Sequence, residues 1–272
     1  YWYACLNGSA DYQAEIQIGR FSTNSLSDFQ NMVNKTINYE RFYSTGNYKK
    51  TLLVAHKEDA PGKYQGCCDS IFNTFTNQLT FTKAYGASNN YGGNDATNAQ
   101  VVNYINSGMH IVNYRGHGMT TCWGINDNRW NTSNQLFEAS QISSINSCSL
   151  YFNICCLTGN IEIEPCMMET FTRSSKGAIA CLAATEEVYT NTNSVFNKQL
   201  FEKLFNNNQW NIGVLNNKAH LDAYYISENN IRAVYNAYAY ICGGDPTLEI
   251  WTGSPSSFSN VSIIRSNSCL TV

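Results

Sequence analysis

Two short motifs carry the residue types that thiol-based catalysis needs. A Gly-His-Gly tripeptide at 116–118 places the imidazole of His117 in a sharp backbone turn, and Cys156 is followed three residues later by Gly159. A thiol nucleophile requires an imidazole within reach of the sulfur and backbone N–H groups directed at the developing oxyanion. His117 is therefore the candidate general base and Cys156 the candidate nucleophile, with the N–H groups of Gly118 and Cys156 as candidate oxyanion donors.

Both motifs also have ordinary structural interpretations. A lone Gly-His-Gly tripeptide is a weak signal, because many such histidines are plain loop residues, and a buried free cysteine usually acts as a small hydrophobic side chain. The places of the two motifs along the chain favour chemistry, since each directly follows a segment of strand character. These segments are residues 110–114 before His117 and residues 149–154 before Cys156.

Strand and helix patterns alternate along the chain, which predicts an α/β fold. The expected strands cover residues 51–55, 110–114, 149–154 and 178–184, and the expected helices lie near residues 29–37, 70–79, 94–108, 165–171 and 195–204. Alternation of this kind gives a largely parallel sheet flanked by helices on both faces. Such sheets place ligands at the carboxyl ends of the strands, so we expect both motifs at the same edge.

Two further strands are expected outside this central region. Apolar and polar residues alternate over residues 14–18, which predicts a half-buried strand, and residues 248–251 predict the last strand after a Gly-Gly-Asp-Pro turn. Residues 253–272 are rich in Gly, Ser, Pro and Asn, a composition typical of a linker. We therefore expect one domain over residues 1–252.

Composition excludes several classes of protein. Of the 272 residues, 43% are hydrophobic and 14% are charged, which is typical of a globular chain. The net charge of −3 gives no electrostatic basis for binding nucleic acid, and the longest purely apolar run, residues 178–184, is too short to span a bilayer. The sequence includes no C-x-x-C pair and no pair of histidines at zinc-ligand spacing, so no structural zinc site is predicted.

Cysteine count and glycosylation motifs favour an extracellular location. Eleven is an odd number, so at least one thiol stays unpaired if the others form disulfides. Four N-x-S/T tripeptides, at Asn7, Asn34, Asn131 and Asn260, are glycosylation sites only in a eukaryotic secretory pathway. Residue 1 is Tyr and no signal peptide is visible, as expected of a processed piece of a longer protein.

Five segments, in the same order and with matching spacing, resemble the gingipain family of cysteine proteases, which is related in fold to caspases and legumains. The segments are residues 14–22, 36–41, 112–123, 156–169 and 244–248, and together they extend over nearly the whole chain. The resemblance implies a caspase-like catalytic domain over residues 1–252. Residues 253–272 then form the linker into a following β-sandwich domain.

The resemblance implies roles for individual residues. His117 is the base and Cys156 the nucleophile, with Cys155 as the alternative, because neighbouring strand residues point to opposite faces and only one of the two can serve. Glu58 resembles the carboxylate that orients the histidine in the arginine-specific members, with a solvated loop acid as the simpler explanation. His56, in the same loop, is expected to be a bystander.

A preference for Arg, or for Lys, at P1 is the implied specificity. Asp69 lies eleven residues after Glu58, the interval between the orienting acid and the pocket aspartate in the arginine-specific members. Glu187 and Tyr189 fall where those enzymes place a polar and an aromatic pocket residue. A carboxylate can bind a guanidinium through two hydrogen bonds, and a tyrosine ring can stack on its plane. The alternative is that Asp69 only caps a helix after Cys68.

Two departures from the family pattern concern the loop after the nucleophile, which is one residue shorter between Cys156 and Pro165 and carries Asn160 in place of an acid. Three functions remain open: an endopeptidase, a sortase-like transpeptidase in which an amine resolves the thioester, and a non-catalytic binding or adhesion relative. Intact His117, Cys156 and flanking glycines disfavour the third function. Sequence does not separate the first two.

The resemblance also implies partners and a location. We expect protein or peptide substrates, additional domains of the same precursor, and a secreted or cell-surface protein. No nucleic acid and no membrane span are expected. No cofactor is required by the resemblance, which leaves room for a structural calcium ion.

Overall fold

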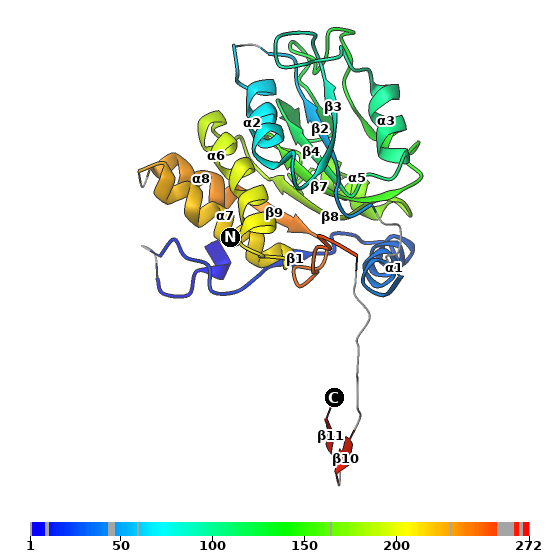
Figure 1. Cartoon of the computed structure of the whole chain (residues 1–272), viewed down its shortest axis with the longest axis vertical. Helices are drawn as coiled ribbons and strands as arrows, with labels where there is room; N and C mark the ends of the chain where they lie inside the picture. Colours follow the sequence, from blue (N-terminus) through cyan, green and yellow to red (C-terminus); the bar gives the residue numbers. More distant parts are fainter. Residues whose placement is uncertain are drawn as a thin grey trace.

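A seven-stranded sheet forms the centre of the molecule, in a computed structural model that describes residues 2–8, 11–42, 47–58, 60–163, 165–228, 230–254, 264–266 and 269–271 (Figure 1). The strands lie in the order β1-β9-β8-β7-β4-β2-β3, and neighbours are parallel except for the antiparallel pair β8 and β9. The largely parallel sheet confirms the predicted fold class. Its strands are β1 (Gly19–Arg20), β2 (Lys50–Ala55), β3 (Thr80–Tyr85), β4 (Ile111–Arg115), β7 (Cys148–Ile154), β8 (Gly177–Ala184) and β9 (Tyr240–Gly243).

Helices cover both faces of this sheet (Figure 1). Apolar residues of α2, α6 and α7 share one core cluster with the sheet, and residues of α3, α4 and α5 share the other. A small antiparallel pair, β5 (Gly118–Met119) and β6 (Cys122–Trp123), follows β4. The helices are η1 (Trp2–Ala4), α1 (Leu26–Phe42), α2 (Gln65–Phe75), α3 (Asn98–Asn106), α4 (Ala139–Ile142), α5 (Met167–Arg173), α6 (Thr190–Phe201), the π-helical η2 (Glu202–Asn206), α7 (Ile212–Ile226) and α8 (Ile231–Ala239).

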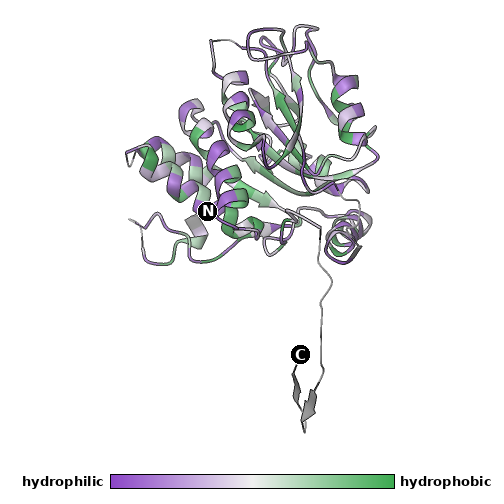
Figure 2. Cartoon of the chain, viewed as in Figure 1, coloured by the Kyte–Doolittle hydropathy of each residue, from purple (hydrophilic) through white to green (hydrophobic). Residues whose placement is uncertain are grey.

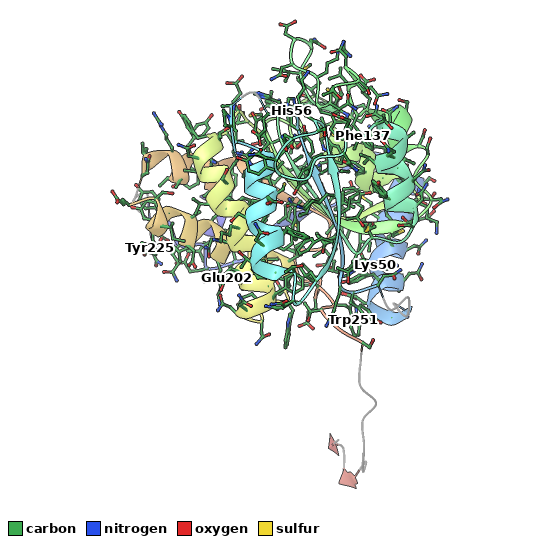
Figure 3. All side chains as sticks on the ribbon, turned by 45° about the horizontal axis from the view of Figure 1, so that its top comes forward. Lys50, His56, Phe137, Glu202, Tyr225 and Trp251 are labelled. Carbon is green, nitrogen blue, oxygen red and sulfur yellow. The ribbon has the colours of Figure 1, made fainter. Side chains whose placement is uncertain are left out.

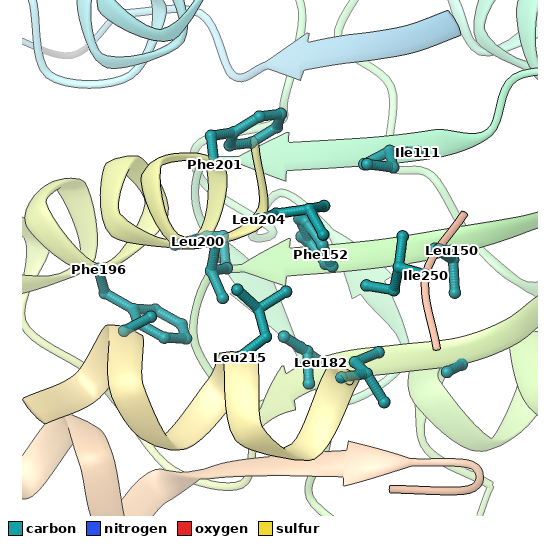
Figure 4. Packing of buried hydrophobic residues seen from close by; sticks show 14 of the residues in the cluster. Ile111, Leu150, Phe152, Leu182, Phe196, Leu200, Phe201, Leu204, Leu215 and Ile250 are labelled. Atoms are coloured by element: carbon teal, nitrogen blue, oxygen red, sulfur yellow. The ribbon is translucent and has the colours of Figure 1, made fainter. Parts of the chain in front are cut away.

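The central strands are mostly apolar because helices cover them on both sides. Every residue of β8 is buried, as expected for a strand in the interior of an α/β sheet. Phe152 of β7 lies near Leu200 of α6 and Leu204 of η2, with Leu215 of α7 in the same cluster (Figure 4). Figure 2 shows hydrophobic residues along the strands and hydrophilic residues on the outer sides of the helices.

Helix α2 begins at Gln65, earlier than the expected helix at residues 70–79. Its first turn is stabilised by a side chain from outside the helix, since the Glu58 carboxylate accepts hydrogen bonds from backbone N–H groups at residues 64–66. Unpaired N–H groups at a helix N-terminus favour such an anionic acceptor. A contact of this kind cannot be recognised from helical periodicity.

Two predicted strands are wrong. Residues 14–18 form no strand, and Ile16 and Ile18 are 43% and 46% exposed, so the alternation there has no core behind it. Residues 248–251 add no strand to the sheet either, although Glu249 makes an isolated bridge to Asn211. The last strand of the sheet is instead β9, which is followed by the predicted turn at residues 243–246.

The C-terminal prediction lies largely outside the described residues. Of residues 253–272, the structure describes 253–254 and a short antiparallel pair, β10 (Ile264–Ser266) and β11 (Cys269–Thr271). A linker and a following β-sandwich domain therefore stay a prediction. Among the described helices, none is both long and apolar enough to cross a membrane.

Candidate active site

The two motifs lie side by side at the carboxyl edge of the sheet. β4 and β7 are adjacent and parallel, with Arg115 paired to Ile154. His117 and Cys156 are each the second residue beyond that pair, so the strand order brings them to the same place. Lys50 begins the neighbouring strand β2, and His56 directly follows its last residue, Ala55 (Figure 3). Ala55 pairs with Arg115, so His56 lies at the edge where both motifs emerge.

The two turns touch through Gly118. A Cβ atom at this position would lie 2.7 Å from the Sγ of Cys155 and 2.7 Å from the carbonyl oxygen of Cys156. Real side chains do not approach this closely, so only glycine allows the backbone after His117 to pack directly on the backbone of the cysteine turn. The geometry therefore brings the candidate base and the candidate nucleophile onto neighbouring, contacting segments.

The backbone of His117 is held firmly, and its ring lies among aromatic neighbours. Its carbonyl oxygen accepts hydrogen bonds from the Tyr114 hydroxyl at 2.7 Å and from the N–H of Gly124 at 2.9 Å. The ring centroid lies 5.2 Å from that of His56 and 5.4 Å from that of Tyr64, both in edge-on arrangements. These contacts place the imidazole against the rings of His56 and Tyr64.

Cys156 is half-buried, and its sulfur lies against the loop between β8 and α6. The N–H of Val188 points to Sγ at 3.5 Å, and the carbonyl oxygen of Val188 is 3.8 Å away. Burial raises the pKa of the Cys156 thiol above its ordinary value, and the Glu187 carboxylate acts in the same direction. The thiol is therefore protonated at neutral pH and needs a base to act as a nucleophile.

The turn after the nucleophile holds a strained residue. Leu157 has φ of +61°, a left-handed conformation that costs a leucine about 1 kcal/mol or more. Hydrogen bonds on both sides keep it there, from the N–H of Leu157 to the carbonyl of Glu186 and from the N–H of Thr158 to the carbonyl of Cys156. Strained backbone of this kind often accompanies functional sites.

Cys155 occupies a different environment from its neighbour. It is fully buried, belongs to the core cluster on the opposite face of the sheet, and lies 3.5 Å from the hydroxyl of Thr158. Burial raises its pKa. Of the two candidate nucleophiles, only Cys156 has a partly accessible sulfur, as alternation along a strand predicts.

Glu58 follows His56 by two residues, and its carboxylate binds the start of α2. Oε1 and Oε2 are each 3.0 Å from the N–H of Tyr64, and Oε1 also accepts from Gly66 at 3.2 Å. The residue that packs on the His117 ring from this loop is His56. Its ring nitrogens face the carbonyl oxygens of Lys57 and Asn128. An orienting role for Glu58 stays a prediction.

Asp69 has a partner of its own, and a shared pocket with Glu187 and Tyr189 stays a prediction. Asp69, on α2, forms an ion pair with Lys83 of β3, at the outer edge of the sheet. Glu187 and Tyr189 lie beside the sulfur of Cys156, in the loop that contains Val188. The ring of Tyr189 is 44% exposed and carries the guanidinium of Arg232 at 5.1 Å from its centroid.

The described residues include no group of three or more His, Cys, Asp or Glu side chains that could hold a metal ion. The ten cysteines whose side chains are described are all free thiols. A structural calcium ion, which could bind backbone and amide oxygens, stays a prediction.

Comparison with known proteins assigns the family. The model of Peptidase family C25 matches residues 1–251. This chain belongs to Peptidase family C25. The predicted relation to gingipains is thereby confirmed, because curated members with that name are among the similar sequences of this C25 chain.

Gingipain R2 of Porphyromonas gingivalis is 30% identical over 186 residues, which is 64% of this chain and 24% of the relative. Lys-gingipain W83 of the same organism is 24% identical over 195 residues, which is 69% of this chain and 10% of the relative. The C25 chain therefore spans about a quarter or less of the curated relatives it matches. Both arginine and lysine gingipains are similar to it.

Solved structures show the same fold. The crystal structure of the Arg-specific cysteine proteinase gingipain R superposes with a TM-score of 0.79 at 22% identity, covering 92% of this chain and 59% of that one. A Saccharomyces cerevisiae separase–securin complex gives a TM-score of 0.54 at 11% identity, covering 79% of this chain and 13% of that one. At these identities the likeness concerns the caspase-like fold alone.

Three residues at the site were not found from the sequence. His56 and Tyr64 pack on His117, and Arg115 is buried directly before the Gly-His-Gly turn. His56 was visible as a histidine at the end of a predicted buried strand, on the edge where ligands bind. Arg115 was visible as a charged residue at the end of an apolar segment, and charged residues are rarely buried without a partner.

Proposed function

We propose that this C25 chain is the catalytic domain of a cysteine endopeptidase, with Cys156 as nucleophile and His117 as general base. The observation that carries the proposal is the direct packing of Gly118 on the Cys155–Cys156 backbone at the carboxyl edge of the sheet. This contact joins an imidazole-bearing turn to a half-buried thiol. The family match supports the reaction class.

The proposed reaction begins with a protonated thiol. Burial raises the pKa of Cys156, so His117 removes the thiol proton as the sulfur attacks the scissile carbonyl carbon. The N–H groups of Gly118 and Cys156 would donate hydrogen bonds to the carbonyl oxygen as negative charge develops on it. His117 then donates the proton to the leaving amine, and water, activated by the same imidazole, hydrolyses the thioester.

Labelling with a peptidyl chloromethylketone, followed by mass spectrometry, tests this proposal. The reagent should modify Cys156, and Cys156→Ala should abolish turnover while Cys155→Ala remains active with some loss of stability. His117→Ala should lower the rate by about two to four orders of magnitude. An active Cys156→Ala variant with an inactive Cys155→Ala variant contradicts the assignment. Product analysis with an added amine acceptor separates hydrolysis from transpeptidation.

A preference for Arg or Lys at P1 is the finer part of the proposal. It is supported by Glu187, an exposed acid that directly precedes the residue contacting the Cys156 sulfur. It is also supported by Tyr189, whose ring already carries a guanidinium, that of Arg232. A peptide library should show cleavage after basic residues, with Glu187→Gln reducing that preference. A preference for acidic or apolar P1 residues contradicts it.

A secreted or cell-surface location, within a longer precursor, completes the proposal. Similarity to gingipains supports it. Of the candidate glycosylation sites, Asn7 and Asn34 are exposed, whereas Asn131 is buried and bonded to the Ala96 carbonyl and Gln135. Fractionation of the native organism followed by immunoblotting of cells and medium tests the location.

A further inference from the structure

Arg115 is a buried cation with an unusual set of partners. It is 1% exposed and lies at the end of β4, two residues before His117. Its guanidinium donates to the carbonyl oxygens of Ile154 at 3.4 Å and Thr190 at 2.8 Å, and to the hydroxyl of Ser194 at 3.2 Å. Among the residues that the structure describes, no carboxylate pairs with it, and its Nε–H has no hydrogen-bond partner.

Burial of a charge without a counter-ion is costly. Even after relaxation, the desolvation of one ion in a protein interior costs several kcal/mol. Carbonyl and hydroxyl groups offset part of that cost, but they leave the net positive charge in place. A buried arginine of this kind is stabilised further only when a negative charge forms near it.

The guanidinium lies between the two segments that hold the Cys156 sulfur. On one side it bonds Ile154, which precedes the nucleophile by two residues. On the other side it bonds Thr190, two residues after Val188, whose backbone contacts the sulfur. The ring of Tyr64 lies 5.1 Å from the guanidinium carbon and also contacts the His117 ring, so one aromatic ring links the cation to the proposed base.

We propose that Arg115 is a positioning residue whose buried positive charge stabilises the Cys156 thiolate. The inference rests on the proposed role of Cys156 as nucleophile. When His117 removes the thiol proton, the thiolate becomes the counter-charge that the guanidinium otherwise lacks. The stabilisation is present before substrate binds, because three hydrogen bonds fix the guanidinium in the free protein.

The charges around the thiol act in opposite directions. Burial raises the pKa of Cys156 and the Glu187 carboxylate raises it, whereas the Arg115 guanidinium lowers it. The same guanidinium lowers the pKa of the buried neighbours Cys155 and Cys68, against a larger rise from burial. The ionisable groups that face this region are Glu187 of the β8–α6 loop, Cys155 just after β7, Tyr64 just before α2, Cys68 of α2, Tyr240 of β9, and His117.

The pH dependence of Cys156 alkylation tests the proposal. Wild-type protein and variants are treated with iodoacetamide over a range of pH, and modification of Cys156 is followed by peptide mass spectrometry. Arg115→Met should move the midpoint of the rate curve up by about one pH unit, which is about a tenfold loss of rate below the midpoint. Arg115→Lys, which keeps the charge, should stay much closer to wild type.

A matched control is available in Lys35. It is a second buried cation whose partners are carbonyl oxygens, including those of Thr172 and Ser174, and it lies away from the proposed dyad. Lys35→Met should lower thermal stability without moving the Cys156 midpoint. If Arg115→Met lowers stability in the same way and leaves the midpoint unchanged, Arg115 is structural and the proposal is overturned.

A second pair of variants covers the case in which Arg115→Met does not fold. Ser194 is partly exposed and bonds the guanidinium, so Ser194→Asp supplies a competing anion and Ser194→Asn serves as its neutral control. Ser194→Asp should slow Cys156 alkylation about tenfold relative to Ser194→Asn, and equal rates overturn the proposal. Absence of Cys156 alkylation in the wild type, with a reactive Cys155, contradicts the proposed function instead.

Discussion

Glu58 is a carboxylate near the proposed active site that stabilises the start of helix α2. It is two residues from His56, which packs on His117, and its oxygens accept the N–H groups that begin α2. A carboxylate at a helix N-terminus stabilises that helix both as a hydrogen-bond acceptor and through the helix dipole. Replacing Glu58 should therefore lower the free energy of unfolding more clearly than it lowers activity.

Glu58→Gln is expected to lower the free energy of unfolding by about 1 kcal/mol, because the amide keeps one acceptor oxygen but loses the charge. Urea denaturation measures that loss, and kcat on a peptide substrate is measured in parallel. An orienting role for Glu58 predicts a different outcome, in which kcat falls at least a hundredfold while stability hardly changes. The two readouts separate the helix cap from the catalytic carboxylate.

Asp69 is expected to act mainly through its ion pair with Lys83. Asp69→Ala should cost up to about 1 kcal/mol of stability, since its ion pair with Lys83 is about a fifth exposed on each side. A double-mutant cycle with Lys83→Met should show coupling between the two, with the P1 preference unchanged. The predicted pocket role is supported instead if Asp69→Ala lowers kcat/KM for Arg substrates by the equivalent of about 2–5 kcal/mol of transition-state binding.

At the scale of elements, the site depends on the contact between the turn after β4 and the turn after β7. Gly118→Ala should lower kcat at least tenfold and destabilise the fold by about 1–3 kcal/mol, the range typical of overpacking. The reason is that the new Cβ meets the Cys155 sulfur and the Cys156 carbonyl at 2.7 Å. Gly253→Ala is the control, because nothing lies within 4 Å of a Cβ there. Equal activity of the two variants would show that the turns do not need to touch.

At the scale of the whole molecule, buried ionisable groups set the pH range of stability. Burial lowers the pKa of His110 to about 4 and that of His220 below its ordinary value. It raises the pKa of Cys122 to about 11 and those of Cys166 and Cys242 to about 12. Below pH 6.5 these histidines become protonated in the unfolded chain but stay neutral in the folded protein. Above pH 9.0 the thiols lose their protons in the unfolded chain but stay protonated in the folded protein.

The free energy of unfolding should therefore be highest between about pH 6.5 and pH 9 and fall on both sides. Each group that is protonated in only one of the two states changes it by about 1.4 kcal/mol per pH unit. Urea titrations at pH 5, 7.5 and 10 measure this dependence. His110→Gln should flatten the acid side, because one buried group no longer titrates. A constant stability from pH 5 to pH 10 contradicts the prediction.

The buried strands and the order of motifs follow from the sequence, because a strand covered on both faces must be largely apolar. Residues 51–55, 149–154 and 178–184 show that pattern, and the structure has strands there. The edge strand β3 was missed, since its residues are mostly half-exposed and carry no continuous apolar signal. Residues 14–18 misled for the opposite reason, because alternation predicts a buried face only where a core lies behind it.

The residues of the proposed dyad could be named from the sequence, but their neighbours could not. Strand order, which depends on long-range pairing, brings the His117 turn onto the cysteine turn. Only the packing of α2 shows that Glu58 meets backbone N–H groups and that Asp69 meets Lys83. Arg115 is buried and has no carboxylate partner among the described residues, which is likewise a property of the tertiary structure. A residue's type fixes its charge, while its neighbours decide what that charge stabilises.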